Sequence, residues 1–79
     1  MPRNMTELQR AVDILAKKCE LAGGKPKKQG TYVSCKLGDV LVEYDANESR
    51  LVVSSSKGYV DMFLDPLDVS NVNLTKLTE

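Results

Sequence analysis

Residues 31–64 alternate between apolar and polar positions with a period of two, which is typical of strands that bury one face of a sheet. Turn signals interrupt the alternation three times. Gly38-Asp39 is a two-residue turn with glycine first, residues 46–49 make a four-residue loop, and Lys57-Gly58 is a second glycine turn. The pattern predicts a four-stranded antiparallel meander with strands at 31–37, 40–45, 50–56 and 59–64.

Counting outward from each turn sorts these strands into two faces, because tight turns fix the pairing register. One face is apolar, and its central row is Cys35, Val42, Val53 and Met62. The opposite face is mixed, and the same counting places Phe63 opposite Val52 and Asp65 opposite Arg50. We expect the apolar face to be buried.

Residues 4–22 have the three-to-four spacing of an amphipathic helix. Asn4 is the expected N-cap with Glu7 completing a capping box, Thr6 is a competing cap, and Gly23-Gly24 is the expected end of the helix. The expected buried stripe is Leu8, Val12, Leu15, Cys19 and Ala22. We expect this stripe to pack on the apolar face of the sheet, since two apolar surfaces are best buried against each other.

Two segments carry weaker patterns. Residues 25–30 are basic and contain a proline, so we expect an irregular connector between the helix and the first strand. Asp65-Pro66 is typical of a helix start, but the residues that follow are poor helix formers. The sequence therefore predicts a short helix at 66–72 and a tail that either docks through Leu74 and Leu77 or frays.

The chain length allows one domain. We expect residues 1–79 to form a single α+β domain, in which an N-terminal helix packs on a four-stranded antiparallel meander and a short helical or irregular tail follows. A core of this size rarely supplies more than about 3–5 kcal/mol, so self-association or a partner would help. Residues 1–38 hold eight Lys/Arg and three Asp/Glu, and residues 39–79 hold three and eight. This charge dipole can steer a partner or hold the two halves together.

The cellular setting is inferred from what the sequence contains. No apolar run is long enough to span a bilayer, and no apolar segment follows Arg3, so we expect neither a membrane span nor a secretory signal. Two cysteines in such a chain indicate a reducing, cytoplasmic setting. Cys19 and Cys35 both face the helix–sheet interface, where two core thiols are the favoured interpretation. A disulfide could form there on oxidation, but the spacing does not require one.

Candidates for catalysis are few. The chain has no histidine, which removes the commonest general base and metal ligand. Two cysteines do not complete a four-ligand zinc site, and Gly23-Gly24-Lys25 follows a helix and lacks the P-loop spacing. We therefore expect a protein that is not an enzyme, with no catalytic residue, metal, cofactor or small-molecule substrate.

The outer sheet face is the leading candidate for a binding site. Its apolar and aromatic residues are Tyr32, Leu41, Val52, Tyr59 and Phe63. Exposed patches of this kind usually mark interfaces, unless the tail folds back to cover them. The edge strands of the expected sheet, residues 31–37 and 59–64, carry few charged residues that would prevent pairing. They could therefore pair with a second copy of the chain or with a strand of a partner. The sequence thus favours a small protein–protein interaction or regulatory module, with a protein partner or a homodimer.

A lysine patch is the alternative site. Its members lie near the end of the helix and in the following connector, and they are Lys17, Lys18, Lys25, Lys27 and Lys28, with Lys36 of the first expected strand as a candidate sixth. Such a patch could bind the phosphates of RNA or DNA. A net charge of zero is a poor match for nucleic acid, however, and the central strands lack the paired aromatic residues that stack on bases. A solvated lysine cluster is the simpler interpretation.

Overall fold

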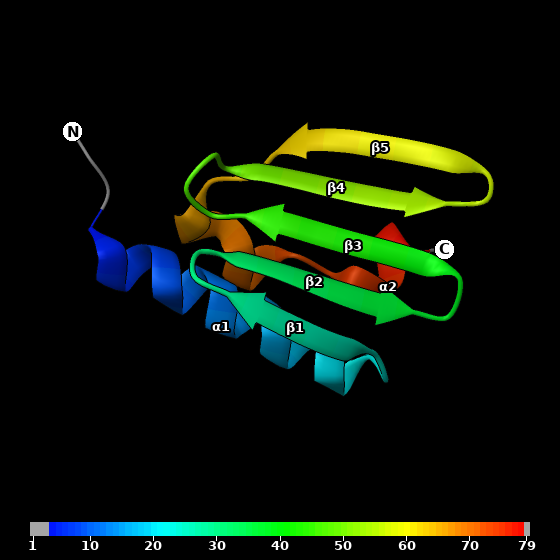
Figure 1. Cartoon of the computed structure of the whole chain (residues 1–79), viewed down its shortest axis with the longest axis horizontal. Coiled ribbons are helices and arrows are strands. Elements are labelled where there is room, and N and C mark those ends of the chain that lie inside the picture. Colours follow the sequence, from blue (N-terminus) through cyan, green and yellow to red (C-terminus); the bar gives the residue numbers. More distant parts are fainter. Residues whose placement is uncertain (1–3, 79) are drawn as a thin grey trace.

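The computed structural model describes residues 4–78, and it has two layers (Figure 1). One layer is a five-stranded antiparallel sheet with the strand order β1-β2-β3-β4-β5. The other layer contains the helical segments. The elements in chain order are α1 Met5–Leu21, β1 Lys25–Gln29, β2 Tyr32–Leu37, β3 Val40–Asp45, β4 Arg50–Ser55, β5 Gly58–Phe63, the 3-10 helix η1 Pro66–Asn71 and α2 Leu74–Leu77. The expected α+β class is confirmed, and the expected number of four strands is wrong.

Helix α1 begins and ends close to the predicted residues. The Asn4 side chain caps it by accepting a hydrogen bond from the Thr6 amide at 2.7 Å. Gly23 ends it with a φ of +89°, a left-handed conformation that glycine adopts without strain. The buried residues of α1 are Leu8, Ala11, Val12, Leu15, Ala16 and Cys19. The predicted stripe is therefore confirmed except at Ala22, which is exposed.

Strand β1 occupies the segment that we expected to be an irregular connector. It pairs with β2 along its whole length, from Lys25 opposite Lys36 to Gln29 opposite Tyr32. The sequence of β1 is Lys-Pro-Lys-Lys-Gln, so it has no apolar alternation that would indicate a strand. Main-chain pairing with β2 holds it in place, and Pro26 is tolerated because β1 is an edge strand.

The three central strands pair in the predicted register. Cys35 lies opposite Val42, and Val42 lies opposite Val53. All three side chains are buried on the inner face, the face that carries the helical layer. Gly38 has a φ of +61°, as the predicted two-residue turn requires.

The hairpin between β4 and β5 turns one residue earlier than expected, which shifts the pairing of the two strands by two residues. Residues 56–57 form the turn, so Val52 lies opposite Asp61, and Phe63 lies opposite Arg50. The expected pairing of Val52 with Phe63 is therefore wrong. A slip by two residues leaves every side chain on its predicted face, because successive side chains point to opposite faces.

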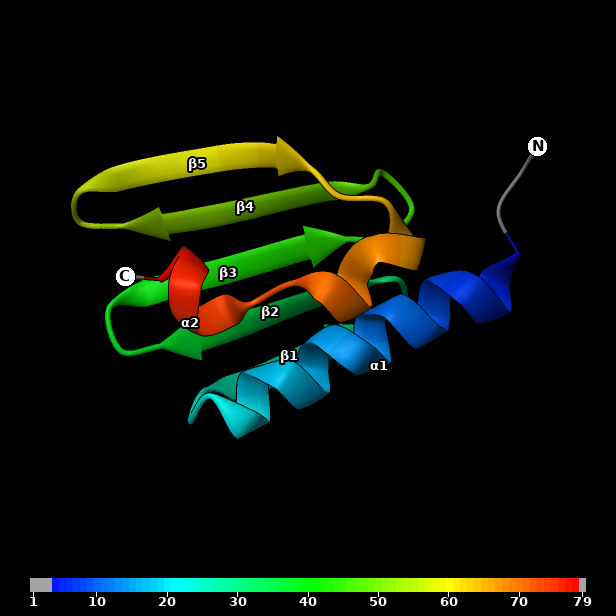
Figure 2. The ribbon, with the colours of Figure 1, turned by 180° about the vertical axis from the view of Figure 1, so that it is seen from behind.

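The tail docks on the inner face, beside α1, as Figure 2 shows. The expected pairing of Asp65 with Arg50 across the strands is wrong, because Phe63 lies opposite Arg50. The Asp65 side chain instead accepts a hydrogen bond from the Leu67 amide at 2.9 Å and begins η1, close to the predicted short helix. Val69 and Leu74 are buried with exposures of 0% and 3%. Since α1 contacts β1 and β2, the inner face of the remaining strands is free to receive this tail.

A disulfide between Cys19 and Cys35 ties α1 to β2. The two Cα atoms are 5.8 Å apart, and both residues are fully buried. The interpretation of these residues as two core thiols is wrong.

Within residues 4–78 there is no helix that is long and apolar enough to cross a membrane.

Candidate binding surface

The outer face of the sheet, turned away from α1 and the tail, is covered by no other element of residues 4–78 (Figures 1 and 2). Its side chains form three rows that run from β1 to β5, because residues paired across antiparallel strands share a face. The rows are Lys25, Lys36, Leu41, Ser54, Tyr59; then Lys27, Ser34, Glu43, Val52, Asp61; and then Gln29, Tyr32, Asp45, Arg50, Phe63.

All five predicted interface residues lie on this outer face, but they do not form one patch. Tyr32, Leu41 and Val52 lie on the central strands and are half-buried. Tyr59 and Phe63 lie near opposite ends of β5 and are 73% and 76% exposed. The register places Asp61 between these two aromatic residues, so the apolar surface consists of a central part and an edge part.

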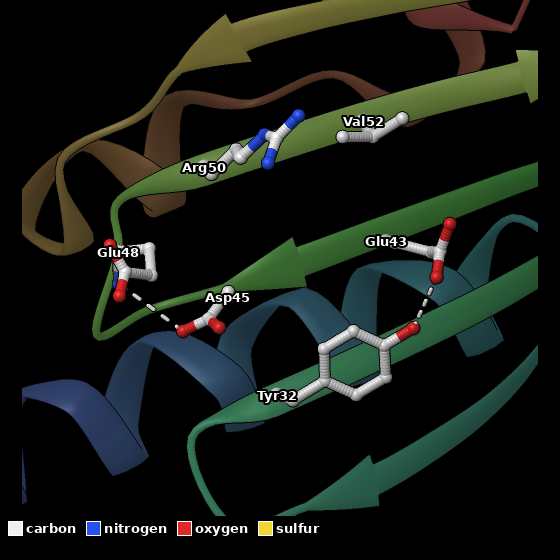
Figure 3. Close-up of a pocket in the computed structure, with 6 residues that line it drawn as sticks. All are labelled: Tyr32, Glu43, Asp45, Glu48, Arg50 and Val52. Carbon is white, nitrogen blue, oxygen red and sulfur yellow. Dashed lines mark hydrogen bonds between the residues drawn. The ribbon is translucent and has the colours of Figure 1, made fainter.

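A shallow hollow of about 290 Å³ lies at one end of the outer face (Figure 3). It is lined by Tyr32, Glu43, Asp45, Glu48, Arg50 and Val52. The Tyr32 hydroxyl donates a hydrogen bond to Glu43 Oε2 at 2.5 Å. This hydrogen bond, helped by partial burial and by the charges of Glu43 and Asp45, raises the pKa of Tyr32 to about 12. The phenol is therefore neutral and acts as a fixed donor.

The carboxylates of the outer face already have partners. Asp45 accepts hydrogen bonds from the amides of Asn47 and Glu48 at 3.0 and 3.2 Å, which hold the loop after β3. Asp61 makes a bidentate ion pair with Arg50, whose Nε lies 3.0 Å from both carboxylate oxygens. The guanidinium hydrogen bonds lower the pKa of Asp61.

Three lysines form a basic band at the β1 end of the outer face. Lys25 and Lys27 come from β1, and Lys36 of β2 lies opposite Lys25. All three are exposed. Lys36 was a candidate sixth member of the predicted lysine patch. The pairing of β1 with β2 brings it into the band, and sequence reasoning could not supply that pairing without recognising β1 as a strand.

The other three lysines of the predicted patch are elsewhere. Lys28 alternates to the inner side of β1 and makes an ion pair with Asp13 of α1 at 3.0 Å. Lys17 and Lys18 belong to α1, in the opposite layer. The Lys18 ammonium donates a hydrogen bond to the Val72 carbonyl at 2.9 Å and so fastens the tail. The structure does not bring the five predicted lysines together.

No family model matches the chain, and neither a curated protein nor a solved structure matches it. In the described part of the chain, no group of three or more His, Cys, Asp or Glu side chains could hold a metal ion. The residues of the outer face are therefore the basis for a functional proposal.

Proposed function

We propose that this protein is a small non-catalytic module that binds another protein through the outer face of its sheet, as a regulator or as a subunit of an assembly. The observation that supports this proposal is the uncovered outer face with its apolar residues. A solvated face of an antiparallel sheet is ordinarily polar. Here Leu41 and Val52 lie at its centre, and Tyr59 and Phe63 are more than 70% exposed at one edge. Apolar side chains gathered on one open sheet face, here in a central part and an edge part, favour an interface.

The charges of the outer face would orient such a partner. Lys25, Lys27 and Lys36 form the basic band at one side, whereas Glu43 and Asp45 lie on the central strand β3. Complementary charge patterns raise the rate of association and fix the register of a complex, while buried apolar contacts supply most of the affinity. We expect the partner surface to carry acidic residues that face the basic band. Beside them we expect an apolar side chain that packs against Leu41 and Val52.

The test is a double variant on the central strands, Leu41→Glu with Val52→Glu. Its control is Leu67→Glu, which introduces one glutamate at a 67% exposed leucine in the opposite layer. Immobilised wild type and both variants would be compared for partner capture from the native cell, and each captured protein would then be titrated in purified form. We expect the face variant to bind at least about tenfold more weakly, which is the effect of losing a central contact. Equal binding by the face variant and the control would contradict the proposal.

Binding of RNA or DNA is the second candidate, and the basic band is the observation that favours it. Three exposed lysines on one face could contact neighbouring phosphates. The carboxylates on the same face oppose this function, so we rank it below protein binding. A mobility shift at two salt concentrations would test it with Lys25→Glu, Lys27→Glu, and Lys76→Glu as the control. No shift of wild type at low salt would rule it out.

We propose the cytoplasm as the location; the disulfide is an observation against it, so the state of the two cysteines in the cell is a direct test. Structural disulfides are rare in reducing compartments. Protein from native cells, quenched in acid and labelled under denaturing conditions, should carry free thiols at Cys19 and Cys35 if the location is cytoplasmic. Thiols that are blocked until a reductant is added would place the protein in an oxidising compartment instead.

A further inference from the structure

The two edges of the sheet differ in their protection against pairing with another strand. Strand β1 has the sequence Lys-Pro-Lys-Lys-Gln, and lysines and proline on an edge discourage such pairing. Strand β5 has neither lysine nor proline, and its one charged residue is Asp61, which is engaged by Arg50. Tyr59, Val60 and Phe63 are 73%, 55% and 76% exposed. The edge of β5 is therefore the one that can accept another strand.

The main-chain groups that point outward from β5 can be identified. The Leu64 amide donates a hydrogen bond to the Ser49 carbonyl at 2.8 Å, so this pair of residues is hydrogen-bonded. Hydrogen-bonded and non-hydrogen-bonded pairs alternate in an antiparallel ladder. Val60 and Met62 therefore direct their main-chain groups toward β4. The N–H and C=O groups of Tyr59, Asp61 and Phe63 point to the open edge.

The side chains of β5 are arranged symmetrically about Asp61. Aliphatic residues, Val60 and Met62, flank it on both sides, and aromatic residues, Tyr59 and Phe63, follow them. A strand with this symmetry is complementary to an antiparallel copy of itself, which is the property that a twofold interface requires. A second copy of this chain is thus the occupant that the sequence of the edge fits.

We propose that two copies of this protein pair through their β5 strands, antiparallel, about a twofold axis at Asp61. Tyr59 of each copy then lies opposite Phe63 of the other on the outer face, and Val60 lies opposite Met62 on the inner face. The N–H and C=O groups of Tyr59, Asp61 and Phe63 all find partners in this register. The result is one continuous sheet of ten strands.

The two Asp61 side chains meet at the axis of this dimer. Like charges placed directly opposite one another destabilise a pair of strands. Each Asp61 carboxylate, however, is held in a bidentate ion pair by Arg50 of its own chain, so the centre holds two positive and two negative charges. The dimer also gives Tyr59 and Phe63 a cross-strand neighbour and leaves Leu41 and Val52 exposed for another partner. The proposal does not rest on protein binding through the central strands.

Two substitutions at one position test the pairing. Asp61→Pro removes the outward N–H and places the proline ring against the second strand, while the hydrogen bonds between β4 and β5 remain. Asp61→Ala keeps the N–H and is the matched control, because both variants lose the ion pair with Arg50. Sedimentation over a wide concentration range should show a dimer for wild type and for Asp61→Ala. We expect the dimer of Asp61→Pro to be weaker by about tenfold or more, since two hydrogen bonds at the axis are lost.

Amide hydrogen exchange provides a readout that does not depend on any variant. The amides of Tyr59, Asp61 and Phe63 should be protected at high protein concentration and exchange rapidly on dilution, whereas the outward amide of Lys28 in β1 should exchange rapidly at both. A wild type that is monomeric at all concentrations would overturn the proposal. So would equal dimerisation of Asp61→Pro and Asp61→Ala when circular dichroism shows both folded. A dimer abolished by Leu41→Glu with Val52→Glu, but not by Asp61→Pro, would instead place the contact on the outer face.

Discussion

Reduction of the disulfide between Cys19 and Cys35 should remove much of the stability of this domain. The bond joins α1 to β2 across the core, and both cysteines are fully buried. Gly24 lies directly against it, since a Cβ at that position would be 2.9 Å from Cys19 Sγ, and the Gly24 amide donates a hydrogen bond to the Cys19 carbonyl at 2.8 Å. The cross-link therefore fixes the angle at which the chain leaves the helix and enters the sheet.

The size of the effect follows from the length of chain that the bond closes. The two cysteines are 16 residues apart, and a loop of that length restricts the unfolded chain by about 3 kcal/mol. A single core of this size supplies roughly 3–5 kcal/mol of net stability. Reduction should therefore lower the free energy of unfolding by about 3 kcal/mol, which corresponds to a melting temperature lower by roughly 10–25 °C.

Urea unfolding with and without a reductant measures this difference on one and the same sequence. Reduction leaves both sulfur atoms in the core, so the change reports on the cross-link. The control is the double variant Cys19→Ala with Cys35→Ala, whose unfolding should not respond to reductant. A change in wild type of less than about 1 kcal/mol would refute the reasoning, because even modest native disulfides contribute more than that.

Three further perturbations test the packing and the outer face. Gly24→Ala should cost roughly 1–3 kcal/mol in urea unfolding, since a Cβ at that position would lie 2.8 Å from a main-chain carbonyl oxygen of β2. Leu74→Ala should cost about 2–5 kcal/mol and Leu67→Ala less than about 0.5 kcal/mol, because the first leucine is 3% exposed and the second is 67% exposed. The raised pKa of Tyr32, at about 12, means that the stability from its hydrogen bond is complete below pH 10 and is lost as the pH rises through about 12. In Glu43→Gln, an NMR titration should find the pKa of Tyr32 nearer its ordinary value of 10.0.

The sequence was sufficient to predict the central sheet and α1 because the buried residues of these elements are apolar at regular spacings. The inner face of β2, β3 and β4 must be apolar at every second residue, and the stripe of α1 must recur at every third or fourth. It was not sufficient for β1. That strand lies at an edge and is mostly exposed, so its sequence shows no alternation of apolar and polar residues. Its pairing with β2 through main-chain hydrogen bonds makes it a strand. The lysine patch was misplaced for the same reason, since β1 turns Lys27 and Lys28 to opposite faces.

The register of β5 is a different case, because the information needed to predict it is present in the sequence. Side-chain alternation cannot detect a slip of two residues, which leaves every face unchanged. The alternation of hydrogen-bonded and non-hydrogen-bonded pairs along the main chain can detect such a slip. The two-residue turn at Gly38-Asp39 is closed by a hydrogen-bonded pair, and the alternation of such pairs then runs through β3 into β4. As a result, the main-chain N–H and C=O groups of Arg50, Val52 and Ser54 point toward β3 and bond to it.

Only the intervening residues can then form main-chain hydrogen bonds with β5, and these include Leu51 and Ser55 of β4 and Ser49 just before it. A turn at Lys57-Gly58 would require residue 56 to bond residue 59, which this alternation forbids. A turn at residues 56–57 joins Ser55 to Gly58, and the hydrogen bond from the Leu64 amide to the Ser49 carbonyl lies in the same phase. The same phase decides which main-chain groups β5 presents at its open edge. The hydrogen-bonding phase on which the proposed dimer depends is therefore set by the turn at residues 38–39, and it is passed through β3 and β4 to the open edge of β5.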